Sequence, residues 1–267
     1  MHKPFFILFL FVAGLASCNR TDLPKEMTLA MEDARHANYE QALVHANACV
    51  AFAPDNIDAQ LLKSYCQFMV ETKPERRRQA LLNMLKCAHQ APERFEPWYF
   101  YGWALLENGQ TRDAIEPLKN ALDRIAPDNP KHREVQLLLE RCYSENNLIP
   151  EALSILQSFQ GQPPYSDMPE LYNELGLLFL KGKDRNPNAA VYFFQRGLQR
   201  DAKGVIQLQN PANEVLLQNL AITYDLHFNN IGEAKRYYIP CMQAKSTRND
   251  TEGIRRIQTR IAQRSSQ

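Results

Sequence analysis

Histidine, cysteine and carboxylate side chains are the groups with which this chain of 267 residues could do chemistry. The sequence shows no metal-ligand spacing such as His-Glu-x-x-His, no Cys-x-x-Cys pair, no glycine-rich phosphate loop and no nucleophile elbow. Its six histidines are His2, His36, His45, His89, His132 and His227. The carboxylates recur at helical spacing beside lysine and arginine, which is typical of a solvated helix face. We therefore expect no metal, no cofactor and no enzyme activity, although a catalytic carboxylate in a groove is left open.

One cysteine has neighbours that indicate a specific modification. His2 and Lys3 precede an apolar run from Phe5 to Leu15, which is too short to span a membrane and has the length of a signal-peptide core. The run ends in Leu-Ala-Ser-Cys at residues 15–18, which resembles a bacterial lipobox. The resemblance implies that residues 1–17 are cleaved as a lipoprotein signal peptide and that Cys18 is lipidated, with residues 18–25 as a tether. The alternative is a secretory signal whose cysteine is incidental.

The charge balance and the remaining cysteines exclude two further classes. Cleavage of the leader removes Lys3 and no acidic residue, so that 30 basic side chains match 30 acidic ones and no field would attract nucleic acid. Five cysteines remain beside Cys18, and an odd number cannot form a complete disulfide framework. They are Cys49, Cys66, Cys87, Cys142 and Cys241. Three of them, Cys49, Cys87 and Cys241, are expected in the core.

The stretch from Trp98 to Pro127 indicates the elements that position these side chains. Large and small residues recur there at helical spacing, first as Trp98, Tyr101, Gly102 and Leu105 and then as Ala114, Leu118 and Ala121. Each set lies on one face of a helix. Gly109 interrupts the first helix, and Pro127 ends the second. The stretch therefore predicts two helices joined by a short turn.

This order of large, small and breaker residues resembles the tetratricopeptide repeat, a helix pair that recurs about every 34 residues. The alanine that opens the second helix recurs five more times along the chain. The six positions are Ala42, Ala80, Ala114, Ala152, Ala190 and Ala234. We find no convincing alternation of period two that would indicate strands.

The resemblance implies an all-α fold, a solenoid of about six helix-turn-helix repeats with a C-terminal capping helix. Residues 26–160 would hold repeats one to four, and residues 169–246 repeats five and six. Between them, residues 161–168 are rich in glycine and proline and are expected to form a linker. Residues 247–267 are the predicted cap.

The predicted cap has an apolar stripe of Ile254, Ile257 and Ile261. Its arginines are expected to stay in solvent; they are Arg255, Arg256, Arg260 and Arg264. Asn249 with Glu252 has the spacing of a capping box. A basic helix on a membrane surface is the alternative. In the preceding helix, Pro240 predicts a kink or an early end.

A stack of hairpins curves and lines its concave side with the first helix of each repeat, where such proteins bind extended peptides or partner helices. By analogy with the family, inner positions of repeats two to four carry residues typical of interaction hot spots. The predicted protein-binding groove consists of Tyr65, Phe68, Tyr99, Trp103, Leu106 and Arg141. The alternative is that they pack against the next hairpin. If Trp103 lines a groove, Trp103→Ala should weaken partner capture and preserve the helical signal.

Some repeat proteins bind a C-terminal carboxylate through lysine and asparagine at fixed inner positions. The fifth repeat offers Asn173 and Lys181, but Leu177 stands where a further asparagine is expected. We therefore do not expect that carboxylate clamp here.

Leader and repeats together favour a non-enzymatic adaptor. It would be a membrane-anchored lipoprotein, most simply at the outer membrane facing the periplasm, that binds another envelope protein or peptide segment and no nucleic acid. Similar architecture occurs in lipoproteins that help assemble outer-membrane barrels, pilot pilus secretins or regulate cell-wall enzymes. Two alternatives are a self-assembling structural envelope protein and a cell-wall or glycan enzyme on a helical scaffold.

Overall fold

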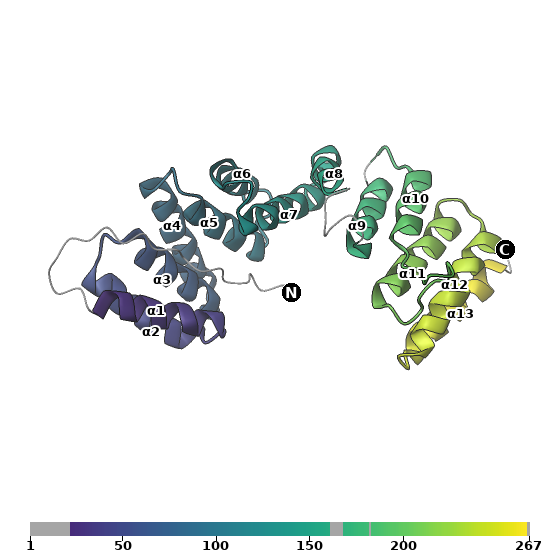
Figure 1. The fold of residues 1–267 in the computed structure, drawn as a ribbon, viewed down its shortest axis with the longest axis horizontal. Helices are drawn as coiled ribbons and strands as arrows, with labels where there is room; N and C mark the ends of the chain where they lie inside the picture. Colours follow the sequence, from purple (N-terminus) through teal and green to yellow (C-terminus); the bar gives the residue numbers. More distant parts are fainter. Residues whose placement is uncertain (1–21, 161–167, 182, 266–267) are drawn as a thin grey trace. The chain divides into compact units, whose positions relative to one another are not determined.

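The fold was analysed in a computed structural model, which describes residues 22–160, 168–181 and 183–265. This part of the chain contains thirteen α-helices and, outside them, one isolated β-bridge between Arg200 and Ile206 (Figure 1). The predicted all-α fold is confirmed. Cys18 and most of the predicted linker lie outside the described residues. The chain divides into two compact units, Met1–Cys142 and Tyr143–Gln267.

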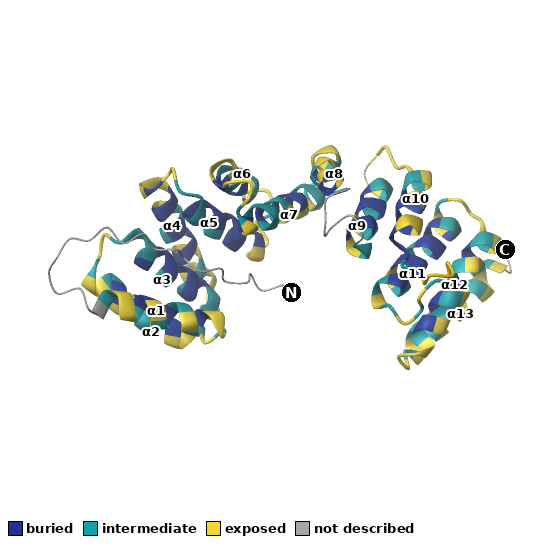
Figure 2. Cartoon of the chain, viewed as in Figure 1, coloured by how far each residue is buried: buried dark blue, intermediate teal, exposed yellow. Residues whose placement is uncertain are grey.

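The first unit consists of successive helix hairpins, and consecutive helices from α1 to α6 pack against each other. Its elements are α1 (Asp22–Arg35), α2 (Tyr39–Phe52), α3 (Ile57–Val70), α4 (Pro74–Gln90), α5 (Phe95–Glu107), α6 (Ile115–Arg124) and most of α7 (Pro130–Glu145). Buried residues follow the faces on which neighbouring helices meet (Figure 2). The core of this unit is therefore a series of helix interfaces.

The second unit continues the same construction. Its elements are the end of α7, then α8 (Ile149–Ser158), α9 (Pro169–Leu180), α10 (Pro187–Gly197), α11 (Pro211–Leu226), α12 (Ile231–Ser246) and α13 (Thr251–Ser265). The close contacts again join consecutive helices, and α11 also packs directly on α9. The predicted series of six hairpins plus a capping helix is thus present.

Small residues determine how closely the two helices of a hairpin approach. All six recurring alanines are 0% exposed. A methyl group on Gly102 would lie 2.7 Å from Cγ of Leu118, and one on Gly176 would lie 2.3 Å from Cε1 of Phe194. Both contacts are too short, so each glycine is required by the close approach of its hairpin's second helix.

Two local predictions at the C-terminal end need comparison with the structure. Helix α12 continues through Pro240 to Ser246, which excludes an early end at the proline, while a kink there stays a prediction. Helix α13 is capped by Asp250, whose Oδ1 accepts a hydrogen bond of 2.8 Å from the Gly253 amide. Asn249 instead has a φ of 58°, a left-handed conformation that asparagine tolerates in a turn. It therefore serves as the turn residue before the cap.

A long connection joins α10 to α11, where the spacing between repeats is largest. Asn213, fully buried at the start of α11, holds this connection through its side-chain amide. Its Oδ1 accepts from the Gln199 amide at 2.7 Å, and its Nδ2 donates to the carbonyls of Gln199 and Gln207 at 2.8 and 2.9 Å. One side chain thus satisfies three backbone groups of the insertion.

Candidate functional site

The predicted groove of the first unit is largely filled by its own side chains. Five of its six residues are between 1% and 4% exposed: Tyr65, Phe68, Tyr99, Trp103 and Leu106. The structure shows for them the packing role that was the alternative at the sequence level. A direct partner contact by these five side chains is not supported by this burial.

The aromatic members of this set contact each other across α3 and α5. The ring centroid of Trp103 lies 5.4 Å from that of Tyr65 and 6.0 Å from that of Phe68. The guanidinium of Arg77, on α4, stacks 4.3 Å above the Phe68 ring. These geometries are those of favourable aromatic and cation–π contacts. We call Tyr65, Phe68 and Trp103 the aromatic cluster.

Tyr99 and Arg141 lie in different surroundings from the aromatic cluster. The Tyr99 hydroxyl donates a hydrogen bond to Glu134 of α7, and Lys131 binds the same carboxylate at 2.6 Å. Arg141 is exposed and lies 3.5 Å from Glu107. Since exposed ion pairs of this length contribute little to stability, Arg141 is the member of the predicted set that a partner could reach. Its role in binding stays a prediction.

The cysteines of the described residues lack the features of reactive thiols. All five are buried. Burial raises the pKa of Cys66 to about 12 and the pKa of Cys49, Cys87 and Cys241 to about 11. A thiol with such a pKa is protonated at neutral pH and is a poor nucleophile.

The described residues also contain no cluster of three or more His, Cys, Asp or Glu suited to a metal ion. None of the helices in this part of the chain has the length and hydropathy needed to cross a bilayer.

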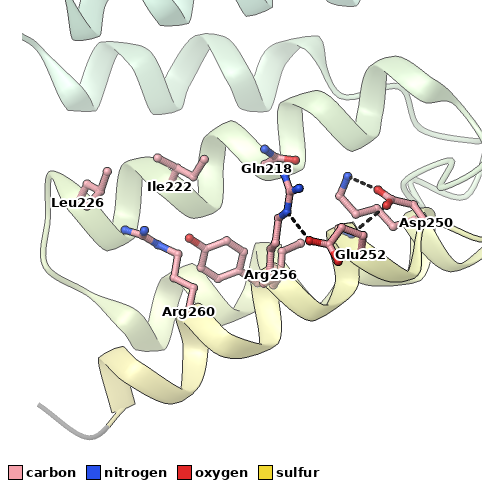
Figure 3. Close-up of a pocket in the computed structure, with 11 residues that line it drawn as sticks. Gln218, Ile222, Leu226, Asp250, Glu252, Arg256 and Arg260 are labelled. Atoms are coloured by element: carbon pink, nitrogen blue, oxygen red, sulfur yellow. Dashed lines mark hydrogen bonds and ion pairs between the residues drawn. The ribbon is translucent and has the colours of Figure 1, made fainter.

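The second unit has an open pocket of about 380 Å³ between α11 and α13. Gln218, Ile222 and Leu226 line it from α11, and Arg256 and Arg260 face them from α13 (Figure 3). Helix α12 contributes Tyr238 and Lys245; Asp250, Glu252, Gly253 and Ile257 complete the lining. We call this site the cap pocket.

The α11 side of the cap pocket is an incompletely covered stripe. Gln218, Ile222 and Leu226 follow each other at intervals of four residues and therefore lie on one helix face. Leu226 is 58% exposed, and Val215, one turn before Gln218, is also exposed. The opposite face of α11 is buried through Leu216, Leu217 and Leu220. Exposed apolar residues beside a pocket are typical of binding surfaces.

The α13 side carries the charge. Arg256 is exposed, and its Nε donates to Glu252 at 3.0 Å. In Figure 3 its side chain extends across the pocket toward Gln218. Lys245 is held between Glu214 at 2.8 Å and Asp250 at 3.0 Å, and these hydrogen bonds and charges raise its pKa against the opposing effect of burial. Lys245 is thus a charged side chain at the edge of the pocket that is already paired with two carboxylates.

A buried carboxylate fixes α13 in place. Asp225 is 0% exposed, and two arginines of α13, Arg260 and Arg264, bind its carboxylate, the second at 2.7 Å. The Tyr238 hydroxyl donates to the same group at 3.3 Å. Burial alone would raise the pKa of Asp225, but hydrogen bonds from Arg264 and Arg260 outweigh it, so the pKa lies below its usual value. The expectation that all four cap arginines stay in solvent is therefore wrong for two of them.

The sequence held a signal for this site that its repeat pattern obscured. Val215, Ile222 and Leu226 are apolar residues on the side of α11 away from its buried stripe, just as Arg256 lies off the apolar stripe of α13. Surplus apolar residues on a helix that already has a buried face indicate a second covered or binding surface. Asp225, in contrast, carries no pattern that predicts its two arginine partners.

Comparison with known proteins finds relatives in structure only. No family model matches the sequence, and no curated protein matches it. PilW, a widely conserved type IV pilus biogenesis factor, is similar with a TM-score of 0.61 at 18% identity, over 90% of this chain and 99% of PilW. PilF of Pseudomonas aeruginosa follows with a TM-score of 0.59 at 16% identity, over 90% of this chain and 97% of PilF.

A third similar structure carries the repeat's name. YrrB, a TPR protein with an unusual peptide-binding site, has a TM-score of 0.52 at 17% identity, over 67% of this chain and 86% of YrrB. At such identities the likeness concerns the fold. It agrees with the six hairpins, the buried alanine of each repeat and the two hairpin glycines. The chain therefore has the tetratricopeptide-repeat fold.

Proposed function

We propose that this protein is a non-catalytic adaptor of the bacterial envelope, anchored by lipid at Cys18, which binds a segment of another envelope protein in its cap pocket. The observation that carries the proposal is the cap pocket itself, where exposed Leu226 and partly buried Ile222 of α11 face exposed Arg256 of α13. A solenoid exposes such a surface because each helix pair buries only the faces that meet its neighbours. The surface left over is available for a partner.

The envelope location rests on two separate supports. The leader has the length and the Leu-Ala-Ser-Cys ending of a lipoprotein signal peptide. Two proteins of similar fold, PilW and PilF, bear names from pilus biogenesis. An outer-membrane adaptor that acts in assembly of a pilus or another envelope machine accounts for both. Cys18→Ser should then abolish incorporation of a labelled fatty acid into the protein and leave the leader of residues 1–17 uncleaved.

Photo-crosslinking in living cells tests the adaptor role. We expect p-benzoylphenylalanine in place of Leu226, in the cap pocket, to crosslink the full chain to a specific envelope protein. The matched control is the same residue in place of Tyr192, an equally exposed position on α10. Identical products from both positions, or none from either, would contradict the proposal. Crosslinks only to a second copy of the chain would favour the self-assembling alternative.

A further inference from the structure

We propose that the cap pocket selects an extended segment with one acidic residue at one end and two apolar residues at the next two alternate positions, in one of the two chain directions. The acidic residue binds Arg256 beside Gln218, and the apolar residues lie on Ile222 and Leu226. This inference rests on the proposed function, because it names the chemistry of the segment that the adaptor binds.

Arg256 is the cation available to an incoming carboxylate. The side chain of this arginine is 77% exposed, and its Nε is used by Glu252. Among the described residues, its two terminal nitrogens have no hydrogen-bond partner. They form the planar pair of donors that binds a carboxylate with two parallel hydrogen bonds. A lysine could not replace this geometry.

The other charges of the pocket are already paired. Lys245 binds Glu214 and Asp250, and Arg260 binds the buried Asp225. Glu252 accepts from Arg255 at 2.8 Å as well as from Arg256. The carboxylates therefore have cation partners, and an added anion would meet the free end of Arg256 without facing an unpaired acid.

The spacing of the α11 side chains matches an extended chain. Gln218, Ile222 and Leu226 are four residues apart, which is about 6 Å per step along a helix. In an extended peptide, alternate side chains point to the same side and are about 6.6 Å apart. Three alternate residues of a bound segment can therefore contact Gln218, Ile222 and Leu226 in turn. Exposed Leu226 and partly exposed Ile222 offer apolar contacts, while Gln218 and Arg256 offer donors.

This anion site differs from the carboxylate clamp considered for the fifth repeat. Asn173 accepts a hydrogen bond of 2.7 Å from Asn219, and Lys181 donates one of 2.7 Å to Ser144. Those two inner side chains are thus bound to neighbouring helices. The free donor comes instead from α13, the helix that follows the last repeat.

Fluorescence anisotropy with defined peptides tests the selectivity. The probes are fluorescein-labelled peptides containing Asp-Ser-Leu-Ser-Leu, or the reverse order Leu-Ser-Leu-Ser-Asp, flanked by Gly-Ser, and the protein is the full chain in detergent. We expect one direction to bind, and replacement of its Asp by Asn to weaken binding tenfold or more. Replacement of both Leu by Ser should have a similar effect.

Two arginine variants of α13 provide the matched comparison. Arg256→Gln should weaken binding of the Asp peptide tenfold or more and leave the Asn peptide nearly unchanged. Arg255→Gln, which removes the same charge and also pairs with Glu252 but does not line the pocket, should change binding less than twofold. Equal effects of the two variants, equal binding of the Asp and Asn peptides, or no saturable binding in either direction would overturn the inference.

Its failure is distinguishable from failure of the adaptor role. If position 226 crosslinks an envelope protein while the Asp and Asn peptides bind alike, the ligand chemistry is wrong and the adaptor role stands. If the peptides discriminate but position 226 crosslinks no protein in cells, the pocket chemistry stands and the adaptor role is wrong.

Discussion

The two units consist of the same kind of helix hairpin, but the side chains between their inner helices differ. In the first unit, large rings from α3 and α5 meet in the aromatic cluster and are at most 4% exposed. In the second, Ile222 and Leu226 of α11 face α13 across an open pocket. The described parts of both units share one mode of helix packing, with a fully buried alanine in every repeat. What differs is the size and chemistry of the side chains between consecutive inner helices.

An inner position alone therefore does not make a residue a binding residue. Tyr65, Phe68 and Trp103 are large enough to reach each other and exclude water, so they become core. On α13 the corresponding side chains are arginines, two of which bind Asp225 near the C-terminal end of α11. The pocket stays open because these charged side chains bind one carboxylate and do not pack into an apolar cluster.

Trp103→Ala should damage the first unit and spare the second. Removal of a buried tryptophan leaves a cavity and costs about 3–5 kcal/mol. Hydrogen exchange followed by mass spectrometry should show faster exchange in α3 and α5 and unchanged exchange in α11 and α12. This replaces the sequence-based expectation that the helical structure would be preserved. Trp103→Phe is the control, with a smaller loss, and unchanged protection of α3 and α5 in the alanine variant would contradict the core role.

Asp225→Asn should loosen α13 and thereby remove one wall of the cap pocket. Breaking a buried pair costs about 3 kcal/mol, because Arg260 and Arg264 lose the carboxylate that neutralises them. The readout is hydrogen exchange of α13 at pH 7. Exchange in α3 and α5 should stay at the wild-type rate.

The ion pairs of Asp225 with Arg260 and Arg264 also predict that stability depends on pH. The folded-state pKa of Asp225 lies below the ordinary value of about 3.9, so its contribution is complete above about pH 5 and is lost as the pH falls through the folded pKa. The difference in thermal stability between the wild type and Asp225→Asn should therefore narrow between pH 5 and pH 3. A difference that is constant over this range would rule out the carboxylate as its source.

The fold could be predicted from the sequence because the repeat is encoded by short-range spacing. The positions of Trp98, Gly102 and Ala114 follow from helical periodicity, and they contact neighbouring helices or, for the Trp98 indole, the connection before its own helix. The same reasoning could not decide whether Trp103 lines a groove or fills it. That outcome depends on how far the rings of α3 reach toward α5, which helical periodicity does not contain.

The cap pocket was harder to predict for a related reason. Asp225 and Arg264 are 39 residues apart, and their pairing depends on how α12 places α13 beside α11. Without that pairing, the arginines of α13 read as a solvated face. Arg256, whose side chain is exposed in the pocket, and Arg260, which binds Asp225, are four residues apart on the same helix. Spacing alone could therefore not distinguish their roles.

Asn213→Ala should release the connection between α10 and α11 without opening the hairpins. The substitution removes three side-chain hydrogen bonds, one from the Gln199 amide and two to the Gln199 and Gln207 carbonyls, at a cost of about 1–3 kcal/mol. Amides of residues 199–210 should exchange faster, and those of α12 should not. Asn210→Ala, which removes a helix cap nearby and keeps the hydrogen bonds of Asn213, is the matched control. Equal effects of the two variants on the exchange of residues 199–210 would contradict the role of Asn213.

Leu226→Ser should leave stability almost unchanged and yet abolish binding of the partner segment. This separation of binding from stability distinguishes the second unit from the first. A side chain that is 58% exposed contributes little to the core, so the change in unfolding free energy should stay within about 0.5 kcal/mol. The same residue offers apolar surface to a partner, and its loss should appear in crosslinking or peptide binding alone. In the first unit no residue of the aromatic cluster can behave in this way, because burial ties its substitution to stability. If Leu226→Ser binds as well as the wild type, the open face of α11 is not the surface that the partner contacts, and exposed Arg141 of α7 becomes the residue to test.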